Sequence, residues 1–404
     1  MAQSYKGKHM KKLMIAVATA GVSASLFAGL YGDTPDAKHA WAVHDWNRPK
    51  PVKVEPGAKL GQPPSDAVVL FDGTEESLKK NWCDKKGEPT LWKLGTEGDF
   101  YCVPDWKNGG DIYTRGSFGD CQLHLEYRHE ADITDGGKGP QMRGNSGVFI
   151  MGNYEIQVLE SYYTRKDDCQ VDNYTDGQAG AVYAENPPMV NPQRKPGEWQ
   201  VYDIVFHQPV WEGGKMLHPG SVTVFFNGVL VQDHWEMEGL TTHCRRRPLA
   251  PHAPKGQLHF QDHGCPVHFR NVWIREIPSR WANTTHSAMS AMEGDVMVLR
   301  YKTAVALLAK IDRTKCEAEQ VKQAYEVISY SKDADVLEPC RKIFAGYLAK
   351  LNALDDKGLD AKKGEILDLK RSVDVLKRNN VANGCALCEK ILAVVEQKGW
   401  NKKK

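Results

Sequence analysis

Two carboxylates and an amide lie close together in one short segment of the sequence. Glu155, Gln157 and Glu160 fall within the run Glu-Ile-Gln-Val-Leu-Glu. On a regular strand Glu155 and Gln157 share a face and Glu160 points away, but a β-bulge after Gln157 would return Glu160 to that face. Paired carboxylates can act as general acid and base, so we predict that Glu155 and Glu160 are catalytic and that Gln157 binds substrate. The alternative is that all three are solvated residues of an exposed strand.

Further polar residues stand before and well after that segment. Arg143 and Asn145 stand just before the predicted hairpin that contains this segment, and an arginine there would suit a substrate hydroxyl or a developing oxyanion. Gln261 and His263 belong to the run Gln-Asp-His-Gly, in which His263 could act as base, acid or metal ligand. We predict that His263 is catalytic and that Arg143, Asn145 and Gln261 bind substrate. Tight-turn chemistry would account for the same residues without a function.

The segments that must position these residues have the pattern of strands. An Asn-Gly pair between β-branched runs predicts a hairpin over residues 222–231, and a Gly-Asn pair predicts another over residues 147–159. Alternating runs at residues 121–127 and 199–206 add further strands. We therefore predict that residues 66–282 form a mainly β domain, an antiparallel sandwich or jelly roll.

The composition changes after that region. From residue 288 onward Pro and Gly become scarce, and apolar residues recur at helical spacing. We predict that residues 283–404 form a small all-α domain of about five helices. Residues 31–65, rich in Pro, Lys, Asp and Gly, read as a linker whose tryptophans could dock on the body of the protein.

The first 30 residues have the pattern of a targeting segment. A basic Met-Lys-Lys precedes an uncharged apolar stretch over residues 13–30, which is typical of a signal peptide. We predict export, to the periplasm or as a secreted protein. The stretch is long enough that an uncleaved leader could instead anchor the chain in a membrane.

Ten cysteines in an exported chain favour disulfides. Six fall between residues 83 and 265 and four between residues 316 and 388, so each domain could pair its own. A four-thiolate zinc site formed by the last four cysteines is the alternative. The net charge of the chain is only +2, from 53 basic and 51 acidic residues, and therefore indicates no polyanionic partner. Nucleic acid is therefore not expected as a partner.

Residues 66–278 resemble the 3-keto-disaccharide hydrolase domain family. The similarity is carried in order by these segments: Phe71-Asp72-Gly73, Gly119-Asp120-Cys121-Gln122-Leu123, Arg143-Gly144-Asn145-Ser146-Gly147, the run from Tyr154 to Glu160, Gly180-Ala181-Val182-Tyr183, Pro196-Gly197-Glu198-Trp199, Phe226-Asn227-Gly228, Gln261-Asp262-His263-Gly264 and Phe269-Arg270-Asn271. The resemblance implies a concanavalin-like jelly roll with a sugar-facing groove and action on sugars oxidised to a ketone at carbon 3. The helical region lies outside it and could bind another protein.

The implied chemistry would begin at carbon 2 of the sugar. A ketone at carbon 3 acidifies the hydrogen on carbon 2, so a base can remove it, the group on carbon 1 can leave, and water can add back. A non-catalytic carbohydrate-binding module and a conventional glycosidase using Glu155 and Glu160 are the alternatives. Tyr183 would bind the apolar face of a sugar. Ca²⁺ could bind an acidic loop at Asp167, Asp168, Asp172 and Asp176, although a solvated acidic loop is the favoured interpretation of these residues.

Overall fold

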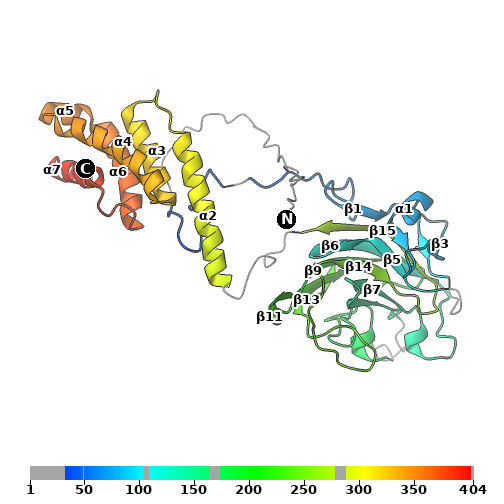
Figure 1. The fold of residues 1–404 in the computed structure, drawn as a ribbon. Helices are drawn as coiled ribbons and strands as arrows, with labels where there is room; N and C mark the ends of the chain where they lie inside the picture. Colours follow the sequence, from blue (N-terminus) through cyan, green and yellow to red (C-terminus); the bar gives the residue numbers. More distant parts are fainter. Residues whose placement is uncertain (1–31, 49, 104–108, 163–172, 278–287, 402–404) are drawn as a thin grey trace, which may run out of the picture. The chain divides into compact units, whose positions relative to one another are not determined.

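The structure is a computed structural model that describes residues 32–48, 50–103, 109–162, 173–277 and 288–401. The chain divides into two compact units, one of Met1–Lys50 with Ser290–Lys404 and one of Pro51–Met289 (Figure 1). The leader expected over residues 1–30 lies outside the described residues. Within the described ranges, no helix combines the length and the apolar character that crossing a membrane requires.

The second unit is a sandwich of two antiparallel sheets (Figure 1). The larger sheet has the order β13-β12-β9-β6-β15-β4-β3, with β1 also paired to β15, and the smaller has the order β2-β5-β14-β7-β8. The larger sheet contains β1 (Val68–Phe71), β3 (Lys93–Leu94), β4 (Phe100–Tyr101), β6 (Cys121–His129), β9 (Gln200–His207), β12 (Ser221–Phe226), β13 (Val229–Glu236) and β15 (Val267–Glu276). The smaller contains β2 (Trp82–Cys83), β5 (Ile112–Phe118), β7 (Ser146–Ile150), β8 (Tyr154–Val158) and β14 (Gly256–Phe260). The predicted antiparallel sandwich is confirmed.

Short elements complete this unit. They are helix α1 (Glu75–Asn81), the 3₁₀ turns η1 (Pro140–Met142) and η2 (Thr175–Gly177), and the ribbon of β10 (Val210–Glu212) and β11 (Lys215–His218). Thr74 caps α1, because its side chain accepts a hydrogen bond from Ser77 N.

Aromatic side chains from both sheets meet in the core between them. Phe260 of β14 lies 4.4 Å from Phe269 of β15, and Trp82 of β2 lies 5.5 Å from Phe100 of β4, measured between ring centroids. All four are buried. Burial of side chains this large is worth about 1.5–3 kcal/mol each, so these pairs hold the two sheets together.

The β7–β8 hairpin positions the polar segment singled out in the sequence. Its turn is centred on Met151 and Gly152, whose φ angles of 54° and 69° suit a type I′ turn. The pairing then runs without a register shift through Phe149↔Glu155 and Gly147↔Gln157. The predicted hairpin is confirmed, but the expected bulge after Gln157 is wrong.

The first unit packs six helices around its own core. They are α2 (Ala288–Ala309), α3 (Glu317–Tyr330), α4 (Ala334–Asn352), α5 (Asp356–Ala361), α6 (Lys363–Arg378) and α7 (Ala386–Gln397). The N-terminal segment over residues 32–48 packs against them: Trp41 contacts Tyr330, and Asn47 Nδ2 donates to Glu326 Oε1 at 2.6 Å. Part of the region read as a linker is therefore ordered structure.

The nine cysteines in the described ranges are all free thiols, and Cys169 lies outside those ranges. The expected disulfides are thus not found among them. Cys83, Cys102, Cys121 and Cys265 are buried in the sandwich, where a thiol packs as a small apolar group. Core packing therefore accounts for these four cysteines without pairing.

Candidate active site

A cavity of about 250 Å³ opens beside the β7–β8 hairpin. Ten residues line it: Asn145, Phe149, Glu155, Gln157, Tyr183, Thr241, Thr242, His243, Gln261 and His263. Six of these were predicted from the sequence as catalytic or substrate-binding residues. The structure therefore gathers most of the predicted site around one cavity, although the predicted residues span more than 100 positions of the chain.

Glu155 is the carboxylate of this cavity. Its side chain is only 3% exposed. Burial raises the pKa of Glu155 to about 8, and the nearby charge of Asp111 adds to the shift. The backbone of Glu155 is fixed on both sides: its N–H donates to Thr241 Oγ1 at 2.9 Å, and its carbonyl accepts from Tyr183 N at 3.1 Å.

Gln157 and Gly147 determine where the Glu155 carboxylate sits. In the orientation that satisfies its amide, the Gln157 nitrogen donates to Glu155 Oε1 and to the Ser146 carbonyl, both at 3.0 Å. Gly147 lies opposite Gln157 on β7. A Cβ atom on Gly147 would come within 2.4 Å of Glu155 Oε1, so only glycine leaves room for the carboxylate.

Three hydrogen-bonding side chains form another part of the site. Tyr183 OH lies 2.9 Å from His243 Nδ1 and 3.3 Å from Tyr174 OH. Burial raises the pKa of Tyr183, so its phenol stays protonated at neutral pH. His243 could not be predicted from the sequence, because its loop has no strand pattern or motif and reaches Tyr183 only through the tertiary fold.

Two further histidines belong to the site: one lines the cavity, and the other packs against a lining residue. His263 lines the cavity as predicted, and burial lowers its pKa. His259 is buried and stacks on Phe149, which lines the cavity, with ring centroids 4.3 Å apart. Burial lowers the pKa of His259 to about 4, so this ring is neutral at physiological pH.

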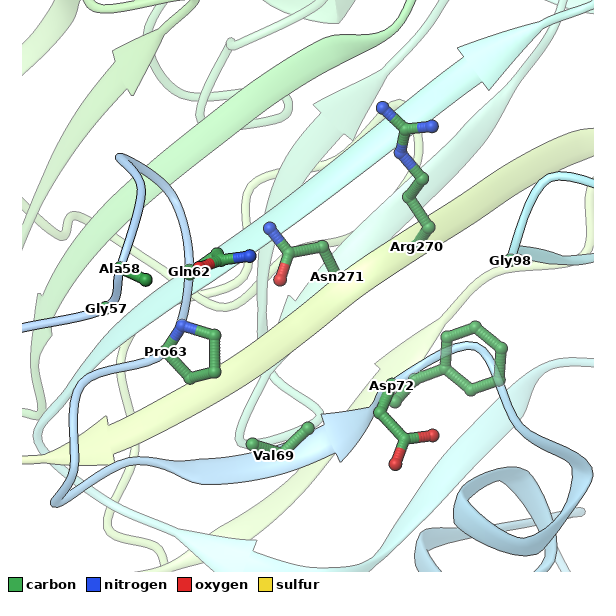
Figure 2. A pocket seen from close by; sticks show the side chains of 10 residues that line it. Gly57, Ala58, Gln62, Pro63, Val69, Asp72, Gly98, Arg270 and Asn271 are labelled. Carbon is green, nitrogen blue, oxygen red and sulfur yellow. The ribbon is translucent and has the colours of Figure 1, made fainter.

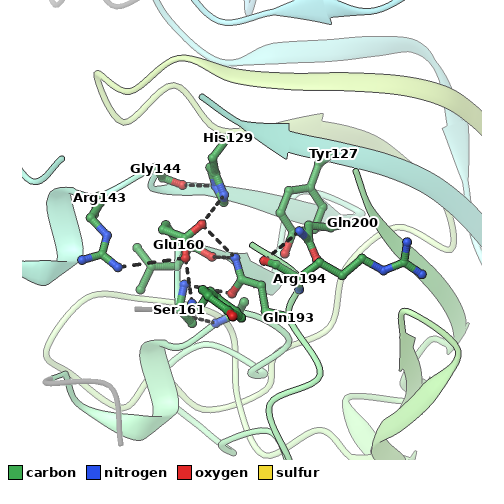
Figure 3. A network of polar contacts seen from close by, with 12 residues as sticks. Tyr127, His129, Arg143, Gly144, Glu160, Ser161, Gln193, Arg194 and Gln200 are labelled. Carbon is green, nitrogen blue, oxygen red and sulfur yellow. Dashed lines mark hydrogen bonds and ion pairs between the residues drawn. The ribbon is translucent and has the colours of Figure 1, made fainter. Parts of the chain in front are cut away.

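Glu160 lies away from this cavity, contrary to the predicted pairing with Glu155. Strand β8 ends at Val158, and the Glu160 side chain, 2% exposed, enters a separate polar network (Figure 3). Its carboxylate accepts from Tyr162 N at 2.7 Å and lies 3.4 Å from His129 Nδ1 and from Gln193 Nε2.

Arg143 belongs to the same network as Glu160. Its Nη2 lies 4.0 Å from Glu160 Oε1, and its carbonyl accepts from Glu160 N at 3.0 Å. The predicted substrate-binding arginine thus contacts a buried structural carboxylate and is not among the residues that line the cavity.

A second cavity, of about 400 Å³, lies between β1, β15 and the segment around residues 57–63 (Figure 2). Its polar side chains already hold neighbouring parts of the chain. Asn271 Nδ2 donates to the Gly61 carbonyl at 2.8 Å, and Arg270 Nε donates to Glu126 Oε2 at 2.7 Å. This cavity is therefore a weaker candidate for chemistry than the one around Glu155.

No group of three or more His, Cys, Asp or Glu side chains in the described part of the chain is arranged to hold a metal ion. Of the acidic loop considered for Ca²⁺, only Asp176 is described; Asp167, Asp168 and Asp172 lie outside the described residues. The Ca²⁺ prediction therefore stays a prediction.

Comparison with known proteins agrees with this fold. A family model of the 3-keto-alpha-glucoside-1,2-lyase-like domain matches residues 66–275. A crystal structure of an inferred glycosyl hydrolase from Parabacteroides distasonis is 38% identical, with a TM-score of 0.51, and the match covers 59% of this chain and 98% of that one. A second inferred glycosyl hydrolase from the same organism is 20% identical, with a TM-score of 0.37 over 52% of this chain and 94% of the other. No curated protein matches.

The family match and the 38%-identical structure support a carbohydrate-active type of enzyme. The chain belongs to the 3-keto-alpha-glucoside-1,2-lyase-like domain family through residues 66–275.

Proposed function

We propose that the sandwich cleaves glycosides that carry a ketone at carbon 3, with Glu155 as the base that removes the hydrogen on carbon 2. Removal of that proton gives an enolate whose charge rests on the carbon 3 oxygen. The electrons then form the carbon 1–carbon 2 double bond as the bond from carbon 1 to the leaving oxygen breaks. Addition of water across the double bond completes a net hydrolysis.

The observation that carries the proposal is the state of Glu155. A carboxylate with a pKa of about 8 is a far stronger proton acceptor than an ordinary one, and a base is most effective when its pKa lies near the working pH. The donors of Gln261 and His263 line the same cavity and could stabilise the enolate oxygen. Tyr183, hydrogen-bonded to His243, could protonate the leaving oxygen.

The same geometry argues against the conventional glycosidase. That mechanism uses two carboxylates about 5–9.5 Å apart on either side of the scissile bond. Among the described residues that line the cavity, Glu155 is the sole carboxylate. Glu160, the predicted second carboxylate, is engaged with His129 and Gln193.

The proposal is tested by comparing a 3-keto disaccharide with its unoxidised parent as substrates. We expect cleavage of the keto sugar alone and a loss of about 10²–10⁴ in rate for Glu155→Gln, since that variant keeps the shape of the side chain but not its basicity. Equal cleavage of both sugars would favour a conventional glycosidase. Binding of a sugar without cleavage of either would favour a carbohydrate-binding module.

Two wider aspects of the function stay proposals. The apolar leader supports export to the periplasm or beyond. The helical unit, which the family match does not cover, is a candidate for binding another protein.

A further inference from the structure

A third cavity, of about 240 Å³, adjoins the one that contains Glu155. The two share Tyr183 and Thr242 as lining residues. Three consecutive arginines, Arg245, Arg246 and Arg247, line the third cavity. A substrate that fills the first cavity and extends past Tyr183 would therefore reach a cluster of guanidinium groups.

The loop that carries the arginines is fixed relative to Glu155. Leu240 N donates to the Arg247 carbonyl at 2.8 Å, which closes the loop on itself. Thr241 N donates to the Asn153 carbonyl at 2.9 Å, and Thr241 Oγ1 accepts from Glu155 N at 2.9 Å. The same loop thus contacts the strand of Glu155 and presents the arginines.

A half-buried carboxylate, that of Glu185, holds the start of the loop. Glu185 accepts from Gly239 N at 2.7 Å, from Glu238 N at 3.1 Å and from Trp235 Nε1 at 3.3 Å. These donors hold the Glu185 carboxylate against two backbone amides and one indole. Among the described residues, this carboxylate forms no ion pair with the arginines.

The charges at this cavity are unbalanced. Arg246 Nη1 lies 3.5 Å from Glu238 Oε2, so one arginine has a partner. Within the described ranges, Arg245 and Arg247 form no ion pair, and both are exposed. Three arginines against two glutamates in the lining leave this cavity with an excess of positive charge.

We propose that this arginine-lined cavity binds an anionic oxygen group, a carboxylate or a sulfate ester, on the part of the substrate beyond the bond that is cleaved. Guanidinium groups bind such groups through paired, charge-assisted hydrogen bonds. The inference rests on the proposed function for the direction in which the substrate extends. It specifies the substrate class as acidic glycosides.

Binding measurements test the subsite independently of catalysis. Three unoxidised disaccharides are titrated into the full-length protein by calorimetry: a neutral one, its uronate counterpart and its sulfate ester. We expect an acidic sugar to bind about three- to tenfold more tightly than the neutral one, and the preference to shrink at high salt. The uronate and sulfate arms show which anion the cavity prefers.

Variants locate the preference. Arg245→Gln combined with Arg247→Gln should reduce the affinity ratio of acidic to neutral sugar to about one. The matched control, Arg341→Gln with Arg371→Gln, removes the same charge from exposed positions of the helical unit and should keep the ratio. Equal or undetectable binding of acidic and neutral sugars by the wild type, or a ratio that survives in the first variant, would overturn the proposal.

Failure of the subsite and failure of the proposed reaction have different signatures. A charge preference in binding without cleavage of any 3-keto sugar would refute the reaction and keep the subsite. Cleavage of a neutral 3-keto disaccharide by a protein with no charge preference would refute the subsite and keep the reaction.

Discussion

The Glu155 carboxylate fills the space that a side chain on Gly147 would need. A Cβ atom at Gly147 would lie 2.4 Å from Glu155 Oε1 and 2.8 Å from an atom of the Phe149 ring. Gly147 pairs with Gln157 and Phe149 pairs with Glu155, so Gly147 and Glu155 are diagonal neighbours on the β7–β8 pair. The hairpin therefore positions the base only while residue 147 is glycine.

Gly147→Ala should therefore displace Glu155 and lower the rate of cleavage by about 10²-fold, since small misplacements of a reacting group have effects of that size. The rate of turnover of a 3-keto disaccharide by the variant and by wild type measures this loss. Gly346→Ala is the matched control, because a Cβ there meets nothing within 4 Å, and it should keep full activity. Full activity of Gly147→Ala would show that Glu155 is not positioned as described.

Glu155→Gln should stabilise the protein at alkaline pH while removing its activity. The pKa of Glu155 is raised from 4.5 to about 8 in the folded state, so the stability tied to its bound proton is present below pH 4.5 and lost as the pH rises through 8. Glutamine stays neutral, so the melting temperature of the variant should exceed that of wild type increasingly from pH 5 to 9.

The pH profile of the reaction gives the companion measurement. Because the base must be deprotonated, kcat/KM of wild type should rise with pH and reach half of its maximum near pH 8. A profile already flat above pH 5, together with a variant less stable than wild type at every pH, would contradict the assigned state of Glu155.

Glu160→Gln should act on stability and spare the chemistry. The change weakens a buried network with His129, Gln193 and the Tyr162 amide, and disturbing buried hydrogen bonds to a charged group costs about 1–3 kcal/mol. Urea unfolding should show that loss, while kcat at a temperature where the variant is folded stays within about threefold of wild type. A drop in kcat as large as that of Glu155→Gln would restore Glu160 as a catalytic residue.

Cys385 should be the most reactive thiol of the helical unit near neutral pH. It caps α7, and its sulfur accepts from Cys388 N at 3.3 Å; hydrogen bonding from Cys388 lowers the pKa of Cys385. Alkylation from pH 6 to 9, followed by peptide mass spectrometry, measures the labelling rate of each thiol. Cys316 is the control, because it stands at the N-cap of α3 without a side-chain cap bond. Faster labelling of Cys316 at pH 7 would contradict the prediction.

The strands and the hairpin that carries Glu155 could be predicted because period-two alternation and Gly-containing turns are local signals. Glu160 could not be placed, because its partners His129 and Gln193 are about 30 residues away in either direction. His243 was missed for the same reason: only the folded loop brings it to Tyr183. Local pattern thus predicted the scaffold, while long-range packing decided which polar residues share the cavity.

Incorporation of deuterium at carbon 2 of the sugar tests the central claim most directly. The protein is incubated with a 3-keto disaccharide in heavy water, and substrate and product are analysed by NMR and mass spectrometry, with Glu155→Gln in parallel. We predict deuterium at carbon 2 of the hydrated product with wild type and at least about 10²-fold slower incorporation with the variant. Cleavage by wild type with carbon 2 unlabelled, or equal labelling by Glu155→Gln, would contradict proton abstraction by Glu155.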